Sequence, residues 1–327
     1  ELTRLAACGR TAAIGMPGSV QERPGLQLNP PGLLTRMHYD RAAKTPYEIE
    51  CMRRASEIAV RGHRAAAEAF RKGQSEYLAH MRYLEACGHR EEEMPYNNIV
   101  AYNENAAVLH YQILARRTPA ALRSFLLDAG AQYRGYAADI TRTHAAEPGL
   151  YADLVARLEL AQLTLCNEVV AGKDYREIQL LAHQLVGQVL AELGVIKLSG
   201  ADAAASGLTS TFFPHGIGHL LGLQVHDVGG LQAGPGGGEI ARPKGHPYLR
   251  LTRKLEPGVV VTIEPGIYFI DLLLQAARGD ERRKSIDWTR VEQLAPYGGV
   301  RIEDNVVATA GAPLNLTRAA FAAGSAH

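Results

Sequence analysis

The chain has 327 residues, of which 46% are hydrophobic and 21% are charged, as in ordinary globular proteins. This length suits one large domain or two ordinary ones, and the composition excludes a wholly disordered chain. The 35 Lys and Arg residues nearly balance the 34 Asp and Glu residues, leaving a net charge of +1. Because nucleic-acid binding needs a concentrated positive field, we expect no such partner. The apolar runs are too short for a transmembrane helix, so we expect no membrane association either.

The cysteines and the first residues bear on the compartment. The four cysteines lie far apart and form no C-x-x-C pattern, which argues against a thiolate metal site or a disulfide framework. The start, E-L-T-R-L-A-A-C-G-R, resembles neither a signal peptide nor a mitochondrial leader, so we expect a cytoplasmic location. The chain does not begin with Met, so we expect that its N-terminus is processed, truncated or incompletely represented.

The first 38 or so residues are rich in Gly and Pro. Short apolar pieces at residues 11–14 and 26–28 predict the stub of a small β-rich unit. The P-P-G sequence at residues 30–32 predicts a linker.

Helical patterns follow this segment. Thr45 is a good N-cap, Pro46 suits the first helical position, and Glu48 completes a capping box, so a helix is expected to begin here. A second helix is expected over residues 76–86. From Asn98 the pattern changes to strands separated by turns. The predicted strands are N-I-V-A-Y, S-F-L-L-D-A-G and Y-R-G-Y-A-A-D-I-T-R-T.

The second half repeats this order. Two long amphipathic helices are predicted over residues 151–171 and 175–193, followed by a loop over residues 194–205. The stretch G-G-L-Q-A-G-P-G-G-G predicts a surface loop. Apolar strands are then expected at residues 259–263, 266–270 and 300–307. Helices followed by strands, twice over, predict an α+β fold with two similar halves and not a doubly wound sheet.

Two aspartates stand in apolar, strand-like surroundings. Asp128 lies in F-L-L-D-A-G, and Asp139 lies in Y-A-A-D-I-T-R-T. A buried carboxylate is costly unless it is paired or binds a metal ion. Two strands joined by a tight turn would let both acids point into one pocket. The alternative is that Asp128 starts a turn and Asp139 caps a neighbouring element.

Two glutamates occur in similar settings nearer the C-terminus. Glu264 ends the apolar strand V-V-V-T-I-E, and Glu303 lies in G-G-V-R-I-E-D-N-V-V. Side chains alternate along a strand, so Arg301 and Glu303 share one face. The alternative for this segment alone is an Arg–Glu pair at a sheet edge.

Three histidines lie close together in a Gly-rich stretch. His215 and His219 occur in P-H-G-I-G-H, and His226 occurs in V-H-D. The spacing is similar to H-E-x-x-H, but Glu is absent and two Gly intervene, so a zincin helix is a poor fit. A structural role is the alternative for any one of them.

Four carboxylates with an imidazole suit hard divalent ions such as Mn²⁺, with Zn²⁺, Co²⁺ or Fe²⁺ also possible. Carboxylates can bridge two such ions, which then share and activate one water.

Residues from about 39 to 317 resemble the pita-bread metallopeptidases. The motifs are L-L-D-A-G, A-D-I-T-R-T, P-H-G-I-G-H-L-L-G-L-Q-V-H-D-V-G-G, T-I-E-P-G-I-Y-F-I and G-G-V-R-I-E-D-N-V-V. M-P-Y-N-N-I-V-A-Y-N-E-N-A-A-V-L-H-Y is most similar to the bacterial Xaa-Pro dipeptidase (prolidase) branch, which includes organophosphorus acid anhydrolases. The resemblance implies two pseudo-symmetric α/β halves around a curved antiparallel sheet. The catalytic domain would be residues 39–327, and residues 1–38 would be a remnant of an N-terminal domain plus a linker.

The resemblance also implies the site. The metal ligands for two divalent ions would be Asp128, Asp139, His219, Glu264 and Glu303, with Asp139 and Glu303 touching both ions. Glu264 would also carry the proton from water to the leaving nitrogen. The groups placed beside the scissile bond or in the substrate pocket would be His110, His226, His215, Arg301 and Tyr96. Arg301 is the first choice for the substrate carboxylate, ahead of Arg250 and Arg253.

The activity implied is hydrolysis of the bond preceding proline in Xaa-Pro dipeptides by a metal-bridging hydroxide. Alternatives are an aminopeptidase P that acts on longer Xaa-Pro peptides, and a pita-bread domain that binds peptides without catalysis. Family members usually carry a full N-terminal domain that helps to form the dimer. Only about 38 residues precede the catalytic part here, so the expected homodimer and the dipeptide selectivity depend on what this segment does.

Overall fold

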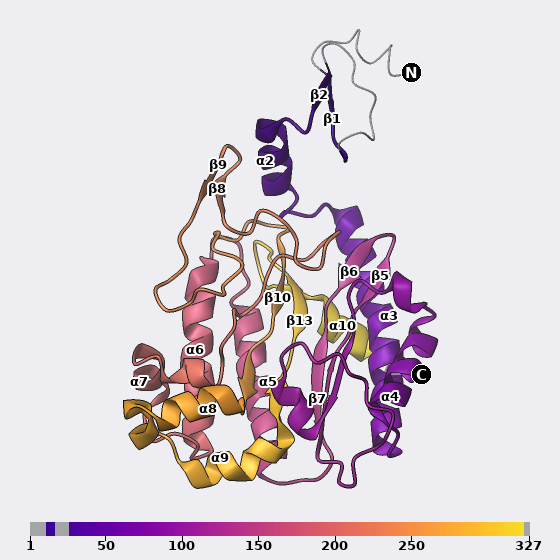
Figure 1. The fold of residues 1–327 in the computed structure, drawn as a ribbon. Coiled ribbons are helices and arrows are strands. Elements are labelled where there is room, and N and C mark those ends of the chain that lie inside the picture. The colour runs from indigo at the N-terminus through magenta and orange to yellow at the C-terminus, as the bar shows by residue number, and fades with distance from the viewer. Residues whose placement is uncertain (1–10, 17–25, 324–327) are drawn as a thin grey trace.

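The computed structural model describes residues 11–16 and 26–323. Of the predicted N-terminal remnant (residues 1–38), residues 1–10, which include Cys8, and residues 17–25 lie outside the described residues. Strands β1 (Thr11–Ala13) and β2 (Leu26–Leu28) pair in parallel, and helix α2 (Pro31–Asp40) follows. The predicted linker was wrong, because Pro31 is the first residue of α2, where its fixed φ suits the first turn. Helix α2 has no buried residue, and these three elements lie at one end of the molecule, at the top of Figure 1.

The first half contains two helices and five strands. The capping box predicted at Thr45 and Glu48 is present at the start of α3. The helices are α3 (Pro46–Arg71) and α4 (Glu76–Cys87). Strands β3 (Ile99–Tyr102), β4 (Ser124–Asp128) and β7 (Thr141–Ala145) form an antiparallel sheet, and β5 (Ala131–Tyr133) pairs with β6 (Tyr136–Ala138) in a hairpin. The order of helices and then strands is as predicted.

The second half repeats the arrangement. It begins with α5 (Leu150–Asn167) and α6 (Tyr175–Glu192). Strands β10 (Val260–Ile263), β13 (Asp304–Val307) and β14 (Leu314–Asn315) form one antiparallel sheet, and β11 (Gly266–Tyr268) pairs with β12 (Gly299–Arg301). The remaining helices are α7 (Gly200–Ala205), α8 (Asp271–Arg278), α9 (Trp288–Leu294) and α10 (Leu316–Ala323). Short 3₁₀ turns are η1 (Glu91–Glu93), η2 (Asn103–Ala107), η3 (Leu208–Thr211), η4 (Glu281–Ser285) and η5 (Ala295–Tyr297).

Four predicted boundaries need correction. Residues 194–205 are not all loop, because Ser199 caps the short helix α7 by accepting from the backbone N–H of Asp202. The predicted strand 300–307 is two strands with different partners, separated at Ile302 and Glu303. The Gly-rich stretch is a hairpin of β8 (Gln232–Gly234) and β9 (Gly237–Glu239), in which Gly237 and Gly238 of β9 adopt the positive φ that glycine allows. The helix predicted to reach residue 171 ends at Asn167.

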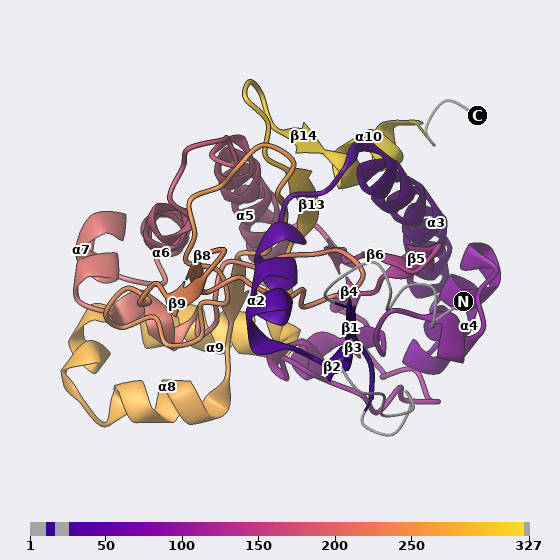
Figure 2. The same cartoon turned by 90° about the horizontal axis from the view of Figure 1, so that it is seen from above.

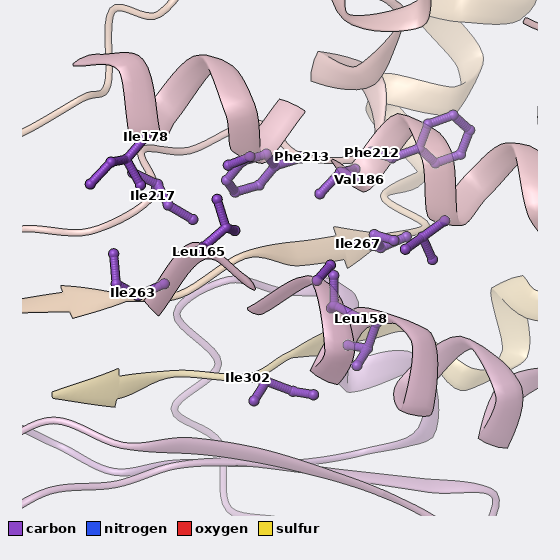
Figure 3. Packing of buried hydrophobic residues seen from close by; sticks show 14 of the residues in the cluster. Leu158, Leu165, Ile178, Val186, Phe212, Phe213, Ile217, Ile263, Ile267 and Ile302 are labelled. Atoms are coloured by element: carbon purple, nitrogen blue, oxygen red, sulfur yellow. The ribbon is translucent and has the colours of Figure 1, made fainter. Parts of the chain in front are cut away.

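The two halves join through their strands. An isolated antiparallel bridge links Thr141 of the first half to Glu303 of the second. Seen from above, α3 and α4 lie on one side of the strands and α6 and α7 on the other (Figure 2). The larger apolar core packs α5 and α6 against the strands of the second half, with Leu158, Leu165 and Ile263 among its buried side chains (Figure 3). In the part of the chain that the structure describes, no helix combines the length and apolar character needed to cross a bilayer.

Candidate metal centre

Strand ends bring the candidate acids to the junction between the halves. Asp128 is the last residue of β4, and Asp139 follows β6 directly. Glu264 follows β10, and Glu303 lies between β12 and β13. Because a strand end releases the chain from its pairing partner, an acid there can turn into a pocket while the strand remains buried.

Three of the five predicted ligands form the tightest group. Asp139, His219 and Glu303 each offer one ligand atom, and these atoms lie within 4.8 Å of one another. The Nε2 atom of His219 is 3.4 Å from an oxygen of Asp139. All three residues are buried, with exposed fractions of 5%, 3% and 2%. This is a donor set that a divalent cation could bind.

The other two predicted ligands flank this group. Glu264 has a carboxylate oxygen 3.6 Å from Nε2 of His219. Asp128 and Glu264 line one cavity, which is described below. Arg301 donates to the Oδ2 atom of Asp128 at 2.6 Å, and Tyr96 donates to its Oδ1 atom at 2.8 Å. The structure therefore gathers all five side chains, with Asp128 already bound by two protein groups.

The acids influence one another's ionisation. Burial raises the pKa of Glu303, and the charges of Asp139 and Glu264 raise it further. Burial likewise raises the pKa of Glu264, to about 7, against the opposing effect of His219. Burial also acts to raise the pKa of Asp139, but its hydrogen bonds with His219 and Tyr96 and the charges of His219 and His226 together outweigh burial and lower this pKa. Four carboxylates brought together in this way favour the binding of cations.

The orientation of His219 fits a metal ligand. Its Nδ1 atom lies 3.0 Å from the carbonyl oxygen of Leu220. A carbonyl only accepts, so Nδ1 carries a hydrogen, and Nε2 faces the carboxylates of Asp139 and Glu264. Burial acts to lower the pKa of His219, but its hydrogen bond with Asp139 and the charges of Glu264 and Asp139 together raise it, which favours a proton on Nε2 when no metal ion is bound. A bound cation would replace this proton and leave the ring neutral. A lone pair that faces two carboxylates is unfavourable unless a cation or a proton lies between them. A divalent cation bound at this position would remove that repulsion.

Two hydroxyl groups that we did not predict support the ligands. Thr141 donates to Oε2 of Glu303 at 2.7 Å, and Thr262 donates to Oε1 of Glu264 at 3.3 Å. Thr262 stands two positions from the acid that it supports, in T-I-E, and alternation along a strand places such a pair on one face, so this spacing was an available signal. Thr141 supports an acid 162 positions away, and no local pattern signals that contact.

A cavity of about 650 Å³ opens beside the acids. His110, His215, His226 and Arg301, which we predicted beside the substrate, all line this cavity. Tyr96 lies outside the lining of this cavity and donates to Asp128, which lines it. A second cavity shares His219, His226, Arg242 and Arg250 with the first, so the two adjoin.

The cavity histidines differ in their surroundings. His215 is fixed, with Nδ1 2.9 Å from the carbonyl of Gly216 and Nε2 2.9 Å from the hydroxyl of Tyr268. Burial and the nearby Arg301 lower its pKa to about 3. His226 packs edge-on against His219, and burial and the charge of His219 lower its pKa to about 4. Both rings are therefore neutral near pH 7.

Arg301 is engaged within the protein. Besides Asp128, it donates to the hydroxyl groups of Tyr268 at 2.8 Å and Thr141 at 3.3 Å. The guanidinium of Arg301 therefore forms an ion pair with Asp128. This pair replaces the Arg–Glu pair that we considered from the sequence. Arg253 is also buried, under the ring of Tyr39.

The chain is similar to named proteins over most of its length. It is 55% identical to the Xaa-Pro dipeptidase of Xanthomonas campestris pv. campestris, over 90% of this chain and 67% of the relative. It is 53% identical to that of Stenotrophomonas maltophilia over the same shares. The zinc-substituted aminopeptidase P of E. coli in complex with product superposes with a TM-score of 0.71 at 28% identity. That match covers 91% of this chain, which spans only 60% of the length of the aminopeptidase P chain.

The sequence profile described as Metallopeptidase family M24 matches residues 50–310. The likeness to aminopeptidase P confirms the predicted pita-bread fold. The family match also agrees with the group of Asp139, His219 and Glu303, which could hold a divalent ion. The chain therefore belongs to metallopeptidase family M24.

Proposed function

We propose that this chain is an Xaa-Pro dipeptidase, which hydrolyses the peptide bond before proline in Xaa-Pro dipeptides. The observation that carries the proposal is the convergence of Asp139, His219 and Glu303, with Glu264 and Asp128 beside them, on the wall of a cavity. The names of the curated relatives support the same substrate class.

The five side chains Asp128, Asp139, His219, Glu264 and Glu303 would hold two divalent cations. When bound, these cations would polarise the substrate carbonyl and lower the pKa of an attacking water. Glu264 would accept the proton of that water on a carboxylate oxygen and pass it to the proline nitrogen, which becomes the leaving amine. Because this amide nitrogen has no hydrogen, a site shaped for the ring loses no hydrogen bond there.

The cavity histidines would act on the substrate directly. His226 is neutral and can donate an N–H to the carbonyl oxygen as negative charge develops on it. His110 lines the same cavity and would hold the other side of the scissile group. His215 is fixed at both ring nitrogens, so it would shape the substrate pocket without transferring a proton.

The substrate carboxylate requires a cation that is not already paired within the protein. Arg301 and Arg253 are both buried and bonded to protein groups. Arg250 is exposed and lines both cavities, so it replaces Arg301 as our first choice for this contact.

Finer features of the function are proposals of the same kind. Oxygen-rich ligand sets favour Mn²⁺, which is our first choice of metal. We retain a cytoplasmic homodimer, to be tested by sedimentation and cell fractionation. We also retain a domain boundary near residue 38, which the lack of buried residues in α2 supports.

Aminopeptidase P activity is the second candidate, because the solved structure named above is an aminopeptidase P. Assay of Gly-Pro, Leu-Pro and a proline tripeptide with Mn²⁺, Co²⁺ and Zn²⁺ in turn separates the candidates. We expect the dipeptides to be cleaved faster. Faster cleavage of the tripeptide would favour the alternative, and binding of peptides without cleavage would indicate a non-catalytic domain.

Metal analysis tests the centre itself. About two divalent ions per chain should bind, and chelation should abolish turnover until the metal is restored. Asp139→Ala and Glu303→Ala should lose both binding and turnover. Turnover by Asp139→Ala at the wild-type rate would refute the assignment.

A further inference from the structure

Glu76 is a buried glutamate to which we have assigned no role so far. It is the first residue of α4, and only 1% of its surface is exposed. Burying a charged carboxylate is costly unless other groups compensate it. In this case the compensation comes from hydrogen-bond donors on one neighbouring segment and from the positive end of the α4 dipole.

Four donors surround the carboxylate of Glu76. Its Oε1 atom accepts from the backbone N–H of Tyr102 at 2.8 Å and from the amide of Asn105 at 2.9 Å. Its Oε2 atom accepts from the hydroxyl of Tyr111 at 2.9 Å and from the backbone N–H of Ala115 at 2.7 Å. Hydrogen bonds to an ionised acceptor are stronger than those between neutral groups.

All four donors belong to the segment that carries His110. Residues 102–115 leave β3, form η2 and then run as irregular chain. The backbone N–H of Tyr77 also donates to the carbonyl of Ala115 at 3.2 Å, so the start of α4 holds this end of the segment twice. Tyr111 is 5% exposed, while its neighbour His110 is exposed and lines the cavity. Fixing Tyr111 therefore fixes where His110 stands.

We propose that Glu76 is a positioning residue that holds the segment 102–115 so that His110 faces the substrate. The proposal rests on the proposed function for its catalytic consequence, but the positioning itself is a property of the fold. Glu76 does not line the cavity, so its effect on the reaction passes through His110.

A glutamine cannot replace this glutamate, although it has the same shape. Each carboxylate oxygen accepts from one backbone N–H, that of Tyr102 or that of Ala115. A glutamine places an NH₂ group at one of the two positions, where it would face a backbone N–H, and two donors cannot form a hydrogen bond. One backbone donor is then left buried and unpaired, which loosens one end of the segment.

The test compares Glu76→Gln with the wild-type protein by hydrogen exchange and by kinetics. Peptides covering residues 102–115 should exchange faster in the variant, while peptides from the second half keep their wild-type rates. With Xaa-Pro dipeptide as substrate, kcat/KM should fall roughly ten- to a hundredfold, since small displacements of a catalytic group have effects of this size. In a His110→Ala background the same substitution should change kcat/KM less than about twofold.

Glu177→Gln is the matched control, because Glu177 lies in the first turn of α6 and is exposed. It should leave both the exchange and the kinetics unchanged. Tyr111→Phe removes one donor and keeps the fold, so a smaller effect in the same direction is expected.

Three outcomes would overturn the proposal. These are wild-type exchange of residues 102–115 in Glu76→Gln, a uniform increase in exchange over the whole chain, and an equal kinetic loss with and without His110. If the wild-type chain cleaved no Xaa-Pro dipeptide, the proposed function would fail, and the exchange comparison would still decide whether Glu76 holds the segment.

Discussion

Buried carboxylates in this protein are compensated in three different ways. Asp304 is paired with Arg142 at 2.7 Å and Arg318 at 2.8 Å, and although burial opposes it, these charges lower its pKa to about 2. Glu76 receives four neutral donors. At the candidate centre, acids instead face acids, and the pKa of Glu303 rises because of burial and the charge of Asp139. Of these three arrangements, the third alone brings several carboxylates into one site, and the negative charge gathered there is why we assign the cations to it.

At the residue scale, Thr141 is expected to matter for metal binding. Thr141→Val removes the hydroxyl that donates to Glu303 while keeping the side-chain shape. Groups that orient a metal ligand typically contribute about ten- to a hundredfold to metal affinity, so we expect a loss of this size. Metal titration by calorimetry measures it. Thr164→Val, on the exposed face of α5, is the control and should bind metal as the wild type does. Unchanged affinity in Thr141→Val would contradict the supporting role.

The second prediction at this scale concerns Arg250. Arg250→Ala should raise KM for an Xaa-Pro dipeptide about tenfold or more, because a hydrogen-bonded ion pair with the terminal carboxylate is lost. The corresponding Xaa-Pro amide should be affected much less, since it lacks that charge. Steady-state kinetics with both substrates provides the comparison. An equal effect on acid and amide would assign the carboxylate contact elsewhere.

At the scale of elements, the packing of α3 on α4 depends on a glycine. A Cβ atom at Gly62 of α3 would lie 2.6 Å from Sγ of Cys87 and 2.7 Å from the ring of Tyr83, both on α4. Gly62→Ala should therefore reduce the free energy of unfolding by about 1–3 kcal/mol through overpacking. Urea denaturation measures this change. Gly32→Ala in α2 meets no atom within 4 Å and serves as the control. Equal stability of the two variants would show that the helices can separate without cost.

The elements themselves differ in how well their sequences predict them. The start of α3 was predicted because Thr45, Pro46 and Glu48 act within one turn. Helix α7 was missed because it is short and its cap, Ser199, stands among small residues without an apolar stripe. The break between β12 and β13 was also missed, because Val300 to Val307 reads as continuous apolar alternation while its two parts pair with different strands.

At the scale of the whole molecule, buried histidines predict acid sensitivity. Burial lowers the pKa of His63 and of His183 to about 3. The unfolded chain binds protons at these residues below about pH 6.5, whereas the folded chain does not until about pH 3. Stability is therefore complete above pH 6.5 and falls as the pH drops, by up to about 1.4 kcal/mol per pH unit for each histidine. His63→Gln should show a shallower fall in unfolding free energy between pH 6.5 and pH 5. A slope equal to that of the wild type would contradict this origin.

The sequence by itself determined the fold class, the succession of helices and strands, and the candidate ligands. Capping boxes and alternation act between near neighbours, and the motifs around Asp128, Asp139, His219, Glu264 and Glu303 are continuous stretches of chain. Only the tertiary structure decided which groups meet. The pairing of Arg301 with Asp128, and the burial of Glu76 under the segment of His110, depend on contacts between distant parts of the chain. A buried charge must be paired with groups that lie near it in space, and the folded chain brings such groups together from distant positions in the sequence.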